Sequence, residues 1–291
     1  MQKNCPKCTK AFEVYDDDLK FLERITSLSF HKSPIPAPTL CPECRQQRRM
    51  SFRNERNLYQ RTCDITGKKI VSIFHPESKQ KVCDKDFFYS DQFDPFNYGR
   101  EFDFSKSFFE QFKTMLLTIP LPSLRVERCE NCDFNNDISD SKNCYLCART
   151  HKSSDMLYTY RGNTSTSCTD CYQVAHSELL YECLECLNSY NCKYLYFCTH
   201  CTDCSFLFDC HSCKDCFMCS NLRNKQYCFQ NQQLSKEEYE KTLANFDLGS
   251  FTDVQKALEM FALGMKQSIK RHLTITNSED CSGDNIVNAK N

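Results

Sequence analysis

Hydrophobic and small residues recur with a period of twelve in the middle of the chain. Counting in twelves from Cys132 gives, in order, Cys132, Cys144, Met156, Cys168, Leu180, Cys192, Cys204, Cys216 and Cys228. Small or apolar residues also stand three, six and nine positions after these marks, so they recur at every third position. An amphipathic helix requires spacings of three and four, and a half-buried strand requires a spacing of two. The pattern therefore predicts neither element.

A fixed repeat of this kind predicts stacked units that bury their apolar sides against one another. Twelve residues allow two short strands and two turns per coil, so the interior must be narrow and its side chains small. The spacing resembles the narrow twelve-residue β-solenoids of insect antifreeze proteins; the resemblance implies geometry alone, because the regular threonine rows are missing. We expect a β-solenoid over residues 129–231, about 38 Å long at roughly 4.8 Å per coil. A coil of twenty-four residues is the alternative.

Other elements flank this repeat. Residues 61–128 predict a hairpin with a Thr-Gly turn, an aromatic core and a helix that begins at Ser105 or Ser107 and ends near Leu117. Residues 232–272 predict a helical cap, with a capping box at Ser235 and Glu238 and a second helix from Asp253 that covers the open end of the repeat. Residues 273–291 are similar to the start of the first repeats, which predicts a second, incomplete solenoid.

Composition adds one anomaly, which is cysteine. The chain of 291 residues has 40% hydrophobic and 26% charged residues and a net charge of −1, values typical of a soluble protein without a strong overall field. It contains 24 cysteines but neither a signal-like N-terminus nor an apolar window of eighteen residues. We therefore expect a cytoplasmic protein with no membrane partner, whose thiols serve as metal ligands or small core residues rather than disulfides.

Two C-P-x-C motifs carry the strongest chemical signal. The four cysteines are Cys5, Cys8, Cys41 and Cys44. This spacing lets two thiolates from one tight turn occupy adjacent corners of a tetrahedral site, which predicts one structural Zn²⁺ in a zinc ribbon over residues 1–60. The residues between the motifs predict a short helix from Asp16 to Ile25. The segment resembles bacterial zinc-ribbon domains, in which a CxxC, an acidic helix and a C-P-x-C-R occur in this order.

Arginines follow the second motif at helical spacing. They are Arg45, Arg48, Arg49, Arg53 and Arg56. Guanidinium groups match phosphate oxygens, so this face predicts docking on RNA or DNA without reading of bases. The alternative is a solvated face that pairs with the acidic residues Asp16 to Asp18.

Further cysteines leave weaker possibilities open. Cys63, His75 and Cys83 offer a second metal site in principle, although packing thiols are the favoured interpretation. Within the repeat, runs such as Cys198-x-x-Cys201-x-x-Cys204 are similar to iron–sulfur ligand strings. The three-residue inward step produces the same spacing without a cluster. A redox or metal-handling protein with an Fe–S cluster or several zinc ions is therefore the alternative function.

Aromatic residues form a second row beside the repeat. Its members are Tyr158, Tyr160, Tyr172, Tyr194, Tyr196, Phe206 and Phe208. Such a row predicts a face that stacks bases or binds a partner protein. The favoured alternative is that the protein's own helices cover it.

Several motifs together identify a family resemblance. They are the paired C-P-x-C motifs, Arg45-Gln-Gln-Arg-Arg49, Phe52-Arg-Asn-Glu-Arg56, Cys63-Asp-Ile-Thr-Gly67, Asp94-Pro95, Tyr98-Gly-Arg100 and Asn221-Leu-Arg-Asn-Lys225. Over nearly the whole chain they resemble a cysteine-rich family of uncultured candidate-phyla bacteria without an established function. Some members carry a CaiB/BaiF CoA-transferase label. That activity needs a large α/β fold and a catalytic aspartate, and no catalytic constellation is evident here. We expect a non-enzymatic, zinc-containing binding or scaffold protein.

Overall fold

The computed structural model describes residues 1–28, 35–51 and 54–290 and divides into two compact units, Met1–Asn57 and Leu58–Asn291. The fold is mixed α/β with mostly strands, and the described residues include six α-helices. No helix in this described part is long and apolar enough to cross a membrane. Each unit is described by itself below.

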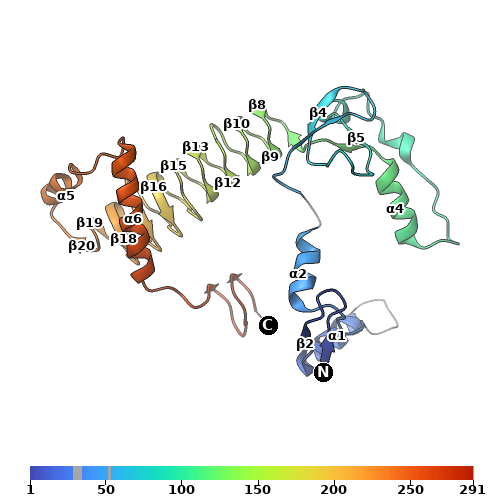
Figure 1. Cartoon of the computed structure of the whole chain (residues 1–291), viewed down its shortest axis with the longest axis horizontal. Helices are drawn as coiled ribbons and strands as arrows, with labels where there is room; N and C mark the ends of the chain where they lie inside the picture. The colour runs from blue at the N-terminus through green and yellow to red at the C-terminus, as the bar shows by residue number, and fades with distance from the viewer. Residues whose placement is uncertain (29–34, 52–53, 291) are drawn as a thin grey trace. The chain divides into compact units, whose positions relative to one another are not determined.

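The first unit combines a small hairpin with two helices (Figure 1). Its elements are β1 (Gln2–Asn4), β2 (Ala11–Glu13), α1 (Asp16–Leu28) and α2 (Pro42–Met50). The prediction of a helix from Asp16 is confirmed, and α1 continues three residues beyond Ile25 because no breaker follows. Three aspartates in its first turn lie at the positive end of the helix dipole.

The predicted arginine helix is shorter than its spacing suggested. The N–H of Ser51 donates to the carbonyl of Gln47 at 2.9 Å, and α2 ends at Met50. The side chain of Asn54 then accepts the N–H groups of Arg56 and Asn57, which is a turn rather than a helix. The prediction that Arg56 shares the helical face is wrong for this reason, and Arg53 lies outside the described residues.

The second unit begins with a small α+β segment. Its elements are β3 (Tyr59–Thr62), β4 (Lys69–Ser72), β5 (Val82–Cys83), α3 (Lys85–Phe88), a 3-10 turn (Pro95–Tyr98), α4 (Phe108–Thr118) and β6 (Leu121–Pro122). The predicted hairpin is confirmed as the antiparallel pair β3–β4. The cap of α4 is also confirmed, because the Ser107 hydroxyl accepts the N–H of Glu110. The predicted aromatic core is wrong in part, since Phe104 and Phe109 are 92% and 79% exposed.

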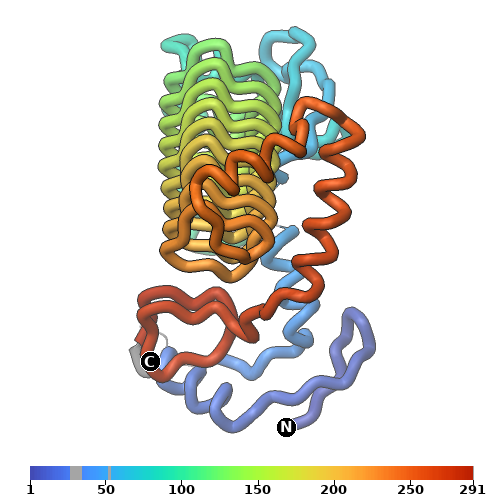
Figure 2. Tube along the Cα trace, turned by 90° about the vertical axis from the view of Figure 1, so that its left-hand side faces the viewer, coloured from blue at the N-terminus to red at the C-terminus, as the bar shows by residue number. Residues whose placement is uncertain are grey.

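A stack of coils follows. Its strands are β7 (Val126–Glu127), β8 (Glu130–Asp133), β9 (Asn136–Ser139), β10 (Lys142–Tyr145), β11 (Ala148–His151), β12 (Tyr160–Asn163), β13 (Thr166–Thr169), β14 (Tyr172–Ala175), β15 (Glu178–Tyr181), β16 (Tyr190–Tyr196), β17 (Ser205–Phe208), β18 (Lys214–Ser220) and β19 (Gln226–Phe229). They pair in parallel with residues twelve apart, as in Cys132 with Cys144 and Cys216 with Cys228. One coil therefore takes twelve residues, not twenty-four. Figure 2 shows the coils lying on one another, and we call residues 126–231 the coil stack.

The backbone of the coil stack follows a three-residue rule. Every third residue from Arg128 to Gln230 has a φ between 46° and 61°, in the left-handed region. From Asn135 to Cys219, the residue that follows each of these left-handed residues is buried in the interior. Hydrogen bonds between coils accompany this geometry: the N–H of Asp155 donates to the carbonyl of Lys142, and the N–H of Lys142 donates to the carbonyl of Ser153. A non-glycine residue in this region costs roughly 1–2 kcal/mol, so each coil depends on its neighbours to offset the strain.

Inward serines satisfy the backbone inside the coil stack. The hydroxyl of Ser165 donates to the carbonyl of Asn163 at 2.9 Å and accepts the N–H of Ser177, one coil on, at 3.3 Å. The same relay runs through the row Ser141, Ser153, Ser165, Ser177 and Ser189. Each inward N–H in this row thereby finds an acceptor where no water is available.

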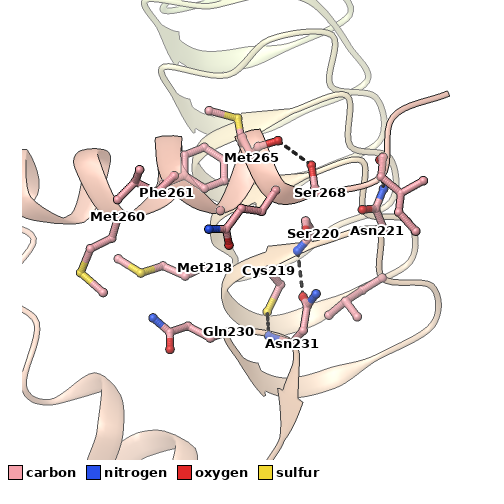
Figure 3. Close-up of a pocket in the computed structure, with 15 residues that line it drawn as sticks. Met218, Cys219, Ser220, Asn221, Gln230, Asn231, Met260, Phe261, Met265 and Ser268 are labelled. Carbon is pink, nitrogen blue, oxygen red and sulfur yellow. Dashed lines mark hydrogen bonds between the residues drawn. The ribbon is translucent and has the colours of Figure 1, made fainter. Parts of the chain in front are cut away.

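Inward cysteines perform the same task. The Cys144 thiol donates to the carbonyl of Lys142, two residues earlier. At the last coil, the Cys219 sulfur accepts the N–H of Asn231, twelve residues later, at 3.4 Å (Figure 3). A thiol both donates and accepts and still fits a narrow interior. Small size, which the sequence suggested, is therefore only half of the reason for cysteine at these positions.

Packing between rows is equally close. A Cβ atom at Gly162 would lie 2.9 Å from the Met156 side chain and 3.3 Å from that of Thr150. Glycine at this position therefore leaves room for the large Met156, which lies fully buried half a coil earlier in the chain. The two residues are compatible only as a pair.

The C-terminal helices cover the side of the coil stack. The remaining elements are β20 (Gln232–Gln233), α5 (Lys236–Leu243), α6 (Phe251–Gln267), β21 (Ile275–Thr276) and β22 (Ile286–Val287). The predicted capping box of α5 is confirmed in both directions. The prediction that the second helix covers the open end is wrong: α6 packs on the aromatic side of β17 and β18, where Phe261 contacts Tyr196 and Phe206. The edge of β19 is paired by the antiparallel β20.

The segment after α6 forms one further small coil. Strand β21 pairs in parallel with β22, with Ile275 opposite Ile286, so the register is eleven residues. Left-handed residues again stand three apart at Asn277 and Asp280. Gly283, with a φ of 138°, lies where one residue is missing from the twelve.

Candidate metal centre

The four N-terminal cysteines lie on two local structures that present them to one point. Cys5 and Cys8 belong to the turn between β1 and β2, which is closed by the N–H of Cys5 on the carbonyl of Lys10. Cys41 is the N-cap of α2 and Cys44 lies in its first turn. Pro42 starts this helix, where its missing N–H has no cost.

Their sulfurs lie close enough together to share one metal ion. The four Sγ atoms all lie within 4.8 Å of one another, and those of Cys8 and Cys41 are 3.6 Å apart. Thiolates around one zinc ion at about 2.3 Å would lie about 3.8 Å from each other. In the part of the chain that the structure describes, this is the only such group of metal-ligating side chains. The predicted cluster could therefore hold a metal ion.

The surroundings prepare one thiol for ionisation. The pKa of Cys5 is lowered to about 6, chiefly because its sulfur accepts the backbone N–H of Cys41, with further donors at Cys8 and Lys7. Burial raises the pKa of Cys44 instead. A divalent cation would have to displace the remaining thiol protons, so its affinity would increase with pH.

Helix α2 presents the arginines beside this centre. Arg45, Arg48 and Arg49 are exposed, and their spacing places them on one side of the helix. Among the described residues none of the three forms an ion pair. Asp17 instead pairs with Lys20, so the alternative of pairing with the acidic start of α1 finds no contact here.

The cysteines of the coil stack lie in a different environment. Burial raises the pKa of Cys219 to about 12 and that of Cys198 well above its usual value. Both are fully enclosed and hydrogen-bonded to backbone carbonyls. A protonated, enclosed thiol is a poor ligand and a poor nucleophile. Cys198 and Cys219 therefore act as core and hydrogen-bonding groups in this fold.

The weaker candidate around Cys63 is not assembled as the sequence suggested. The ring nitrogen Nδ1 of His75 accepts the N–H of Glu77 and the ring packs on Tyr59. The Cys63 sulfur accepts the N–H groups of Thr66 and Asp84, both at 3.2 Å. Cys63, His75 and Cys83 thus do not meet as three ligands of one site.

The predicted aromatic face divides into two parts. Tyr158 is half exposed, and Tyr160 and Tyr172 lie 5.4 Å apart between ring centres on the open side. The later members, Tyr194, Tyr196, Phe206 and Phe208, form one cluster with α5 and α6. The protein's own helices therefore cover the second part, as the alternative interpretation expected.

A hollow of about 770 Å³ lies between α6 and the last coils (Figure 3). Its lining residues include the methionines Met218, Met260 and Met265 together with side chains that carry amide and hydroxyl groups. No acidic, basic or histidine side chain is among its lining residues. The hollow thus lacks the acid–base groups that hydrolysis or group transfer would need.

No protein-family model matches the chain, and no curated protein is similar enough to it to count as a match.

Proposed function

We propose that this protein is a non-enzymatic binding protein whose metal-organised N-terminal unit docks on the phosphate backbone of a nucleic acid. The single observation that carries the proposal is the exposed arginine side of α2, which begins at the metal centre itself. The ion would fix the start of the helix and thereby the direction of Arg45, Arg48 and Arg49. Guanidinium groups held in this way contact phosphate oxygens without reading sequence.

Charge is distributed in a way that supports this function. Residues 1–57 contain eleven Lys and Arg against seven Asp and Glu, a formal charge of +4, whereas the whole chain has a charge of −1. The rest of the chain is therefore acidic, and the basic field is confined to the first unit. A local basic patch is sufficient for non-specific binding, which is dominated by counterion release.

Zinc is the ion that we propose for the centre, because a set of four thiolates favours it over oxygen-preferring cations. We further propose that the coil stack is a β-solenoid that serves as a rigid scaffold, with the open Tyr158 side available to a partner protein. Both proposals, the structural zinc ion and the rigid scaffold, describe a protein that binds partners and catalyses no reaction.

Fluorescence anisotropy with a labelled single-stranded RNA of mixed sequence tests the nucleic-acid function. The full chain should bind at low salt, and its affinity should fall steeply as salt rises. Replacing Arg45, Arg48 and Arg49 by Gln should weaken binding at least tenfold and reduce the salt slope by about 2, since each lost phosphate contact on a single strand contributes about 0.7.

A charge-matched control separates local docking from net charge. Replacing Lys236, Lys241 and Lys256 by Gln removes three positive charges from α5 and α6. This variant should bind as the wild type does. Absence of binding at low salt, or equal loss in both variants, would contradict the proposed docking through α2.

A further inference from the structure

The turn that holds Cys5 and Cys8 has a counterpart in the second unit. Cys63 stands in the turn between β3 and β4 as Cys5 stands between β1 and β2. In both hairpins, the residue before the cysteine pairs with the residue six positions after it: Asn4 with Ala11, and Thr62 with Lys69. The register of the two hairpins is therefore identical.

The hydrogen bonds of the two turns also correspond. The N–H of Cys5 donates to Lys10, and the N–H of Cys63 donates to Lys68, in each case to the carbonyl five residues on. The residue four positions on is left-handed in both, with a φ of 63° at Thr9 and 71° at Gly67. Its N–H returns to the carbonyl of the cysteine in both turns.

The helix that follows completes the correspondence. Cys41, the N-cap of α2, donates its N–H to the Cys5 sulfur. Asp84, the N-cap of α3, donates its N–H to the Cys63 sulfur at 3.2 Å. Both caps occupy the same place, so the position of Cys44 corresponds to that of Phe87.

We propose that residues 59–88 are a second copy of the metal-binding module in which the ligand positions are Cys63, Thr66, Asp84 and Phe87, so that hydrogen bonds replace the ion. The inference rests on the proposed metal centre only for the identity of the first copy. The chain thus offers two places of the same geometry and keeps metal ligands at one.

Each replaced position has a structural role that accounts for its residue. The Asp84 carboxylate accepts the N–H of Asp86 and caps α3. Phe87 packs on Phe93, with ring centres 6.4 Å apart. The retained Cys63 sulfur accepts N–H groups from positions equivalent to those that donate to the Cys5 sulfur in the first copy. Although burial acts in the opposite direction, these donors lower the pKa of Cys63.

Restoring the missing ligands tests the inference. The full chain is prepared with Co²⁺ in place of other metals, and bound cobalt and its thiolate absorption are measured. The wild type should hold one equivalent. The variant T66C/D84C/F87C should hold two, with a second set of tetrahedral thiolate bands.

Matched controls make each outcome decisive. The variant I65C/K68C/K85C adds three cysteines to the same module away from the ligand positions and should stay at one equivalent. Cys63→Ser should leave the cobalt content unchanged, whereas Cys5→Ser should remove it, and this pair remains informative even if the triple variant fails to fold. Two equivalents in the wild type, or a folded T66C/D84C/F87C protein with one, would overturn the inference. No cobalt in the wild type together with a gain of one in the triple variant would refute only the first centre.

A separate observation concerns the phenylalanines around α4. Phe102, Phe104, Phe108, Phe109 and Phe112 are between 45% and 92% exposed. At about 200 Å² per ring, they present roughly 600 Å² of aromatic surface. Monomeric proteins rarely expose more, and one side of a stable protein interface covers about 800 Å².

We infer that this surface pairs with the same surface of a second copy of the chain. The area is close to what one side of a dimer requires. A two-fold contact of this kind is the commonest in homo-oligomers.

Light scattering after size exclusion tests the pairing at two protein concentrations, about 5 µM and about 100 µM, which suit an interface of this size. The wild type should be dimeric at the higher concentration, and F104E/F109E should be monomeric at both. Phe251→Glu, which alters an equally exposed phenylalanine at the start of α6, should behave as the wild type. A monomeric wild type, or a dimer that F104E/F109E leaves intact, would overturn the inference.

Discussion

At the scale of single residues, the inward side chains of the coil stack are chosen for hydrogen bonding as much as for volume. Serine and cysteine share one property that alanine lacks: a hydroxyl or thiol group at the γ position that donates to a carbonyl of its own coil and accepts an N–H from the next. This explains why serines are buried along one row and why that row continues with cysteines at Cys201 and Cys213.

Replacing Ser165 separates size from hydrogen bonding. Ser165→Ala removes the acceptor for the N–H of Ser177 and should destabilise the coil stack by about 1–3 kcal/mol, the cost of an unsatisfied buried donor. Ser165→Cys keeps the relay and should lose less. Urea unfolding monitored by circular dichroism measures both. Equal midpoints for the alanine and cysteine variants would show that volume alone matters.

Low pH should break an exposed ion pair between Arg128 and Asp140 at the first coils. The Arg128 guanidinium binds the Asp140 carboxylate and holds its pKa at about 2, below its usual 3.8. Since this folded-state pKa is depressed, the contact is fully stabilising above about pH 4 and is lost as pH falls through 2. A carboxyl NMR titration should give a midpoint near 2 in the wild type and nearer 3.8 in Arg128→Gln. Equal midpoints in the wild type and in Arg128→Gln would contradict the contact between Arg128 and Asp140.

At the scale of elements, periodicity and capping residues predicted much of the secondary structure. Three features depend only on residues close in sequence and could be predicted from local patterns. They are the cap at Ser107, the capping box at Ser235 and the twelve-residue register. The position of α6 could not be predicted from a local pattern. An apolar stripe indicates that one side of a helix is buried, but it does not indicate which surface covers that side. For the same reason, the phenylalanines near α4 resembled a core in sequence, although the fold leaves them exposed.

We expect the ring of Phe261 to stabilise the packing of α6 on the coil stack. Phe261 is 4% exposed against Tyr196 and Phe206, so Phe261→Ala should cost about 3–5 kcal/mol and expose the aromatic row. Leu263→Ala, at a side chain that is 58% exposed, serves as the control and should change stability by less than about 0.5 kcal/mol. Hydrogen exchange of α6 and calorimetry report both. Similar effects of the two changes would contradict this packing.

At the scale of the whole molecule, the metal centre was readable from sequence because its ligands come in two adjacent pairs. The second copy around Cys63 was hidden because three of its four ligand positions hold other residues. The remaining signal in the sequence is a lysine five positions after the cysteine in both turns. The structure adds a left-handed residue four positions after the cysteine. It gains meaning only when the two hairpin registers are compared.

Metal removal should affect the two units differently. In the proposed centre, a strong chelator would withdraw the ion that joins the turn of Cys5 and Cys8 to α2, so hydrogen exchange in residues 1–28 and 35–50 should become fast. The coil stack, which is held by hydrogen bonds between coils, should keep its protection, as should the hairpin of β3 and β4. The comparison is made on one sample before and after chelation. Loss of protection throughout the chain would show that the units do not fold separately.

The left-handed residue at every third position also determines which changes of length the chain can tolerate. An insertion of one or two residues within a coil would turn every following inward side chain outward, whereas three would keep the inward phase but shift each side of the coil by one. Only whole multiples of twelve preserve both. Natural variants of the coil stack should therefore differ in length by entire coils. Shorter changes should coincide with a glycine such as Gly283, in the small coil after α6 whose register is eleven residues instead of twelve.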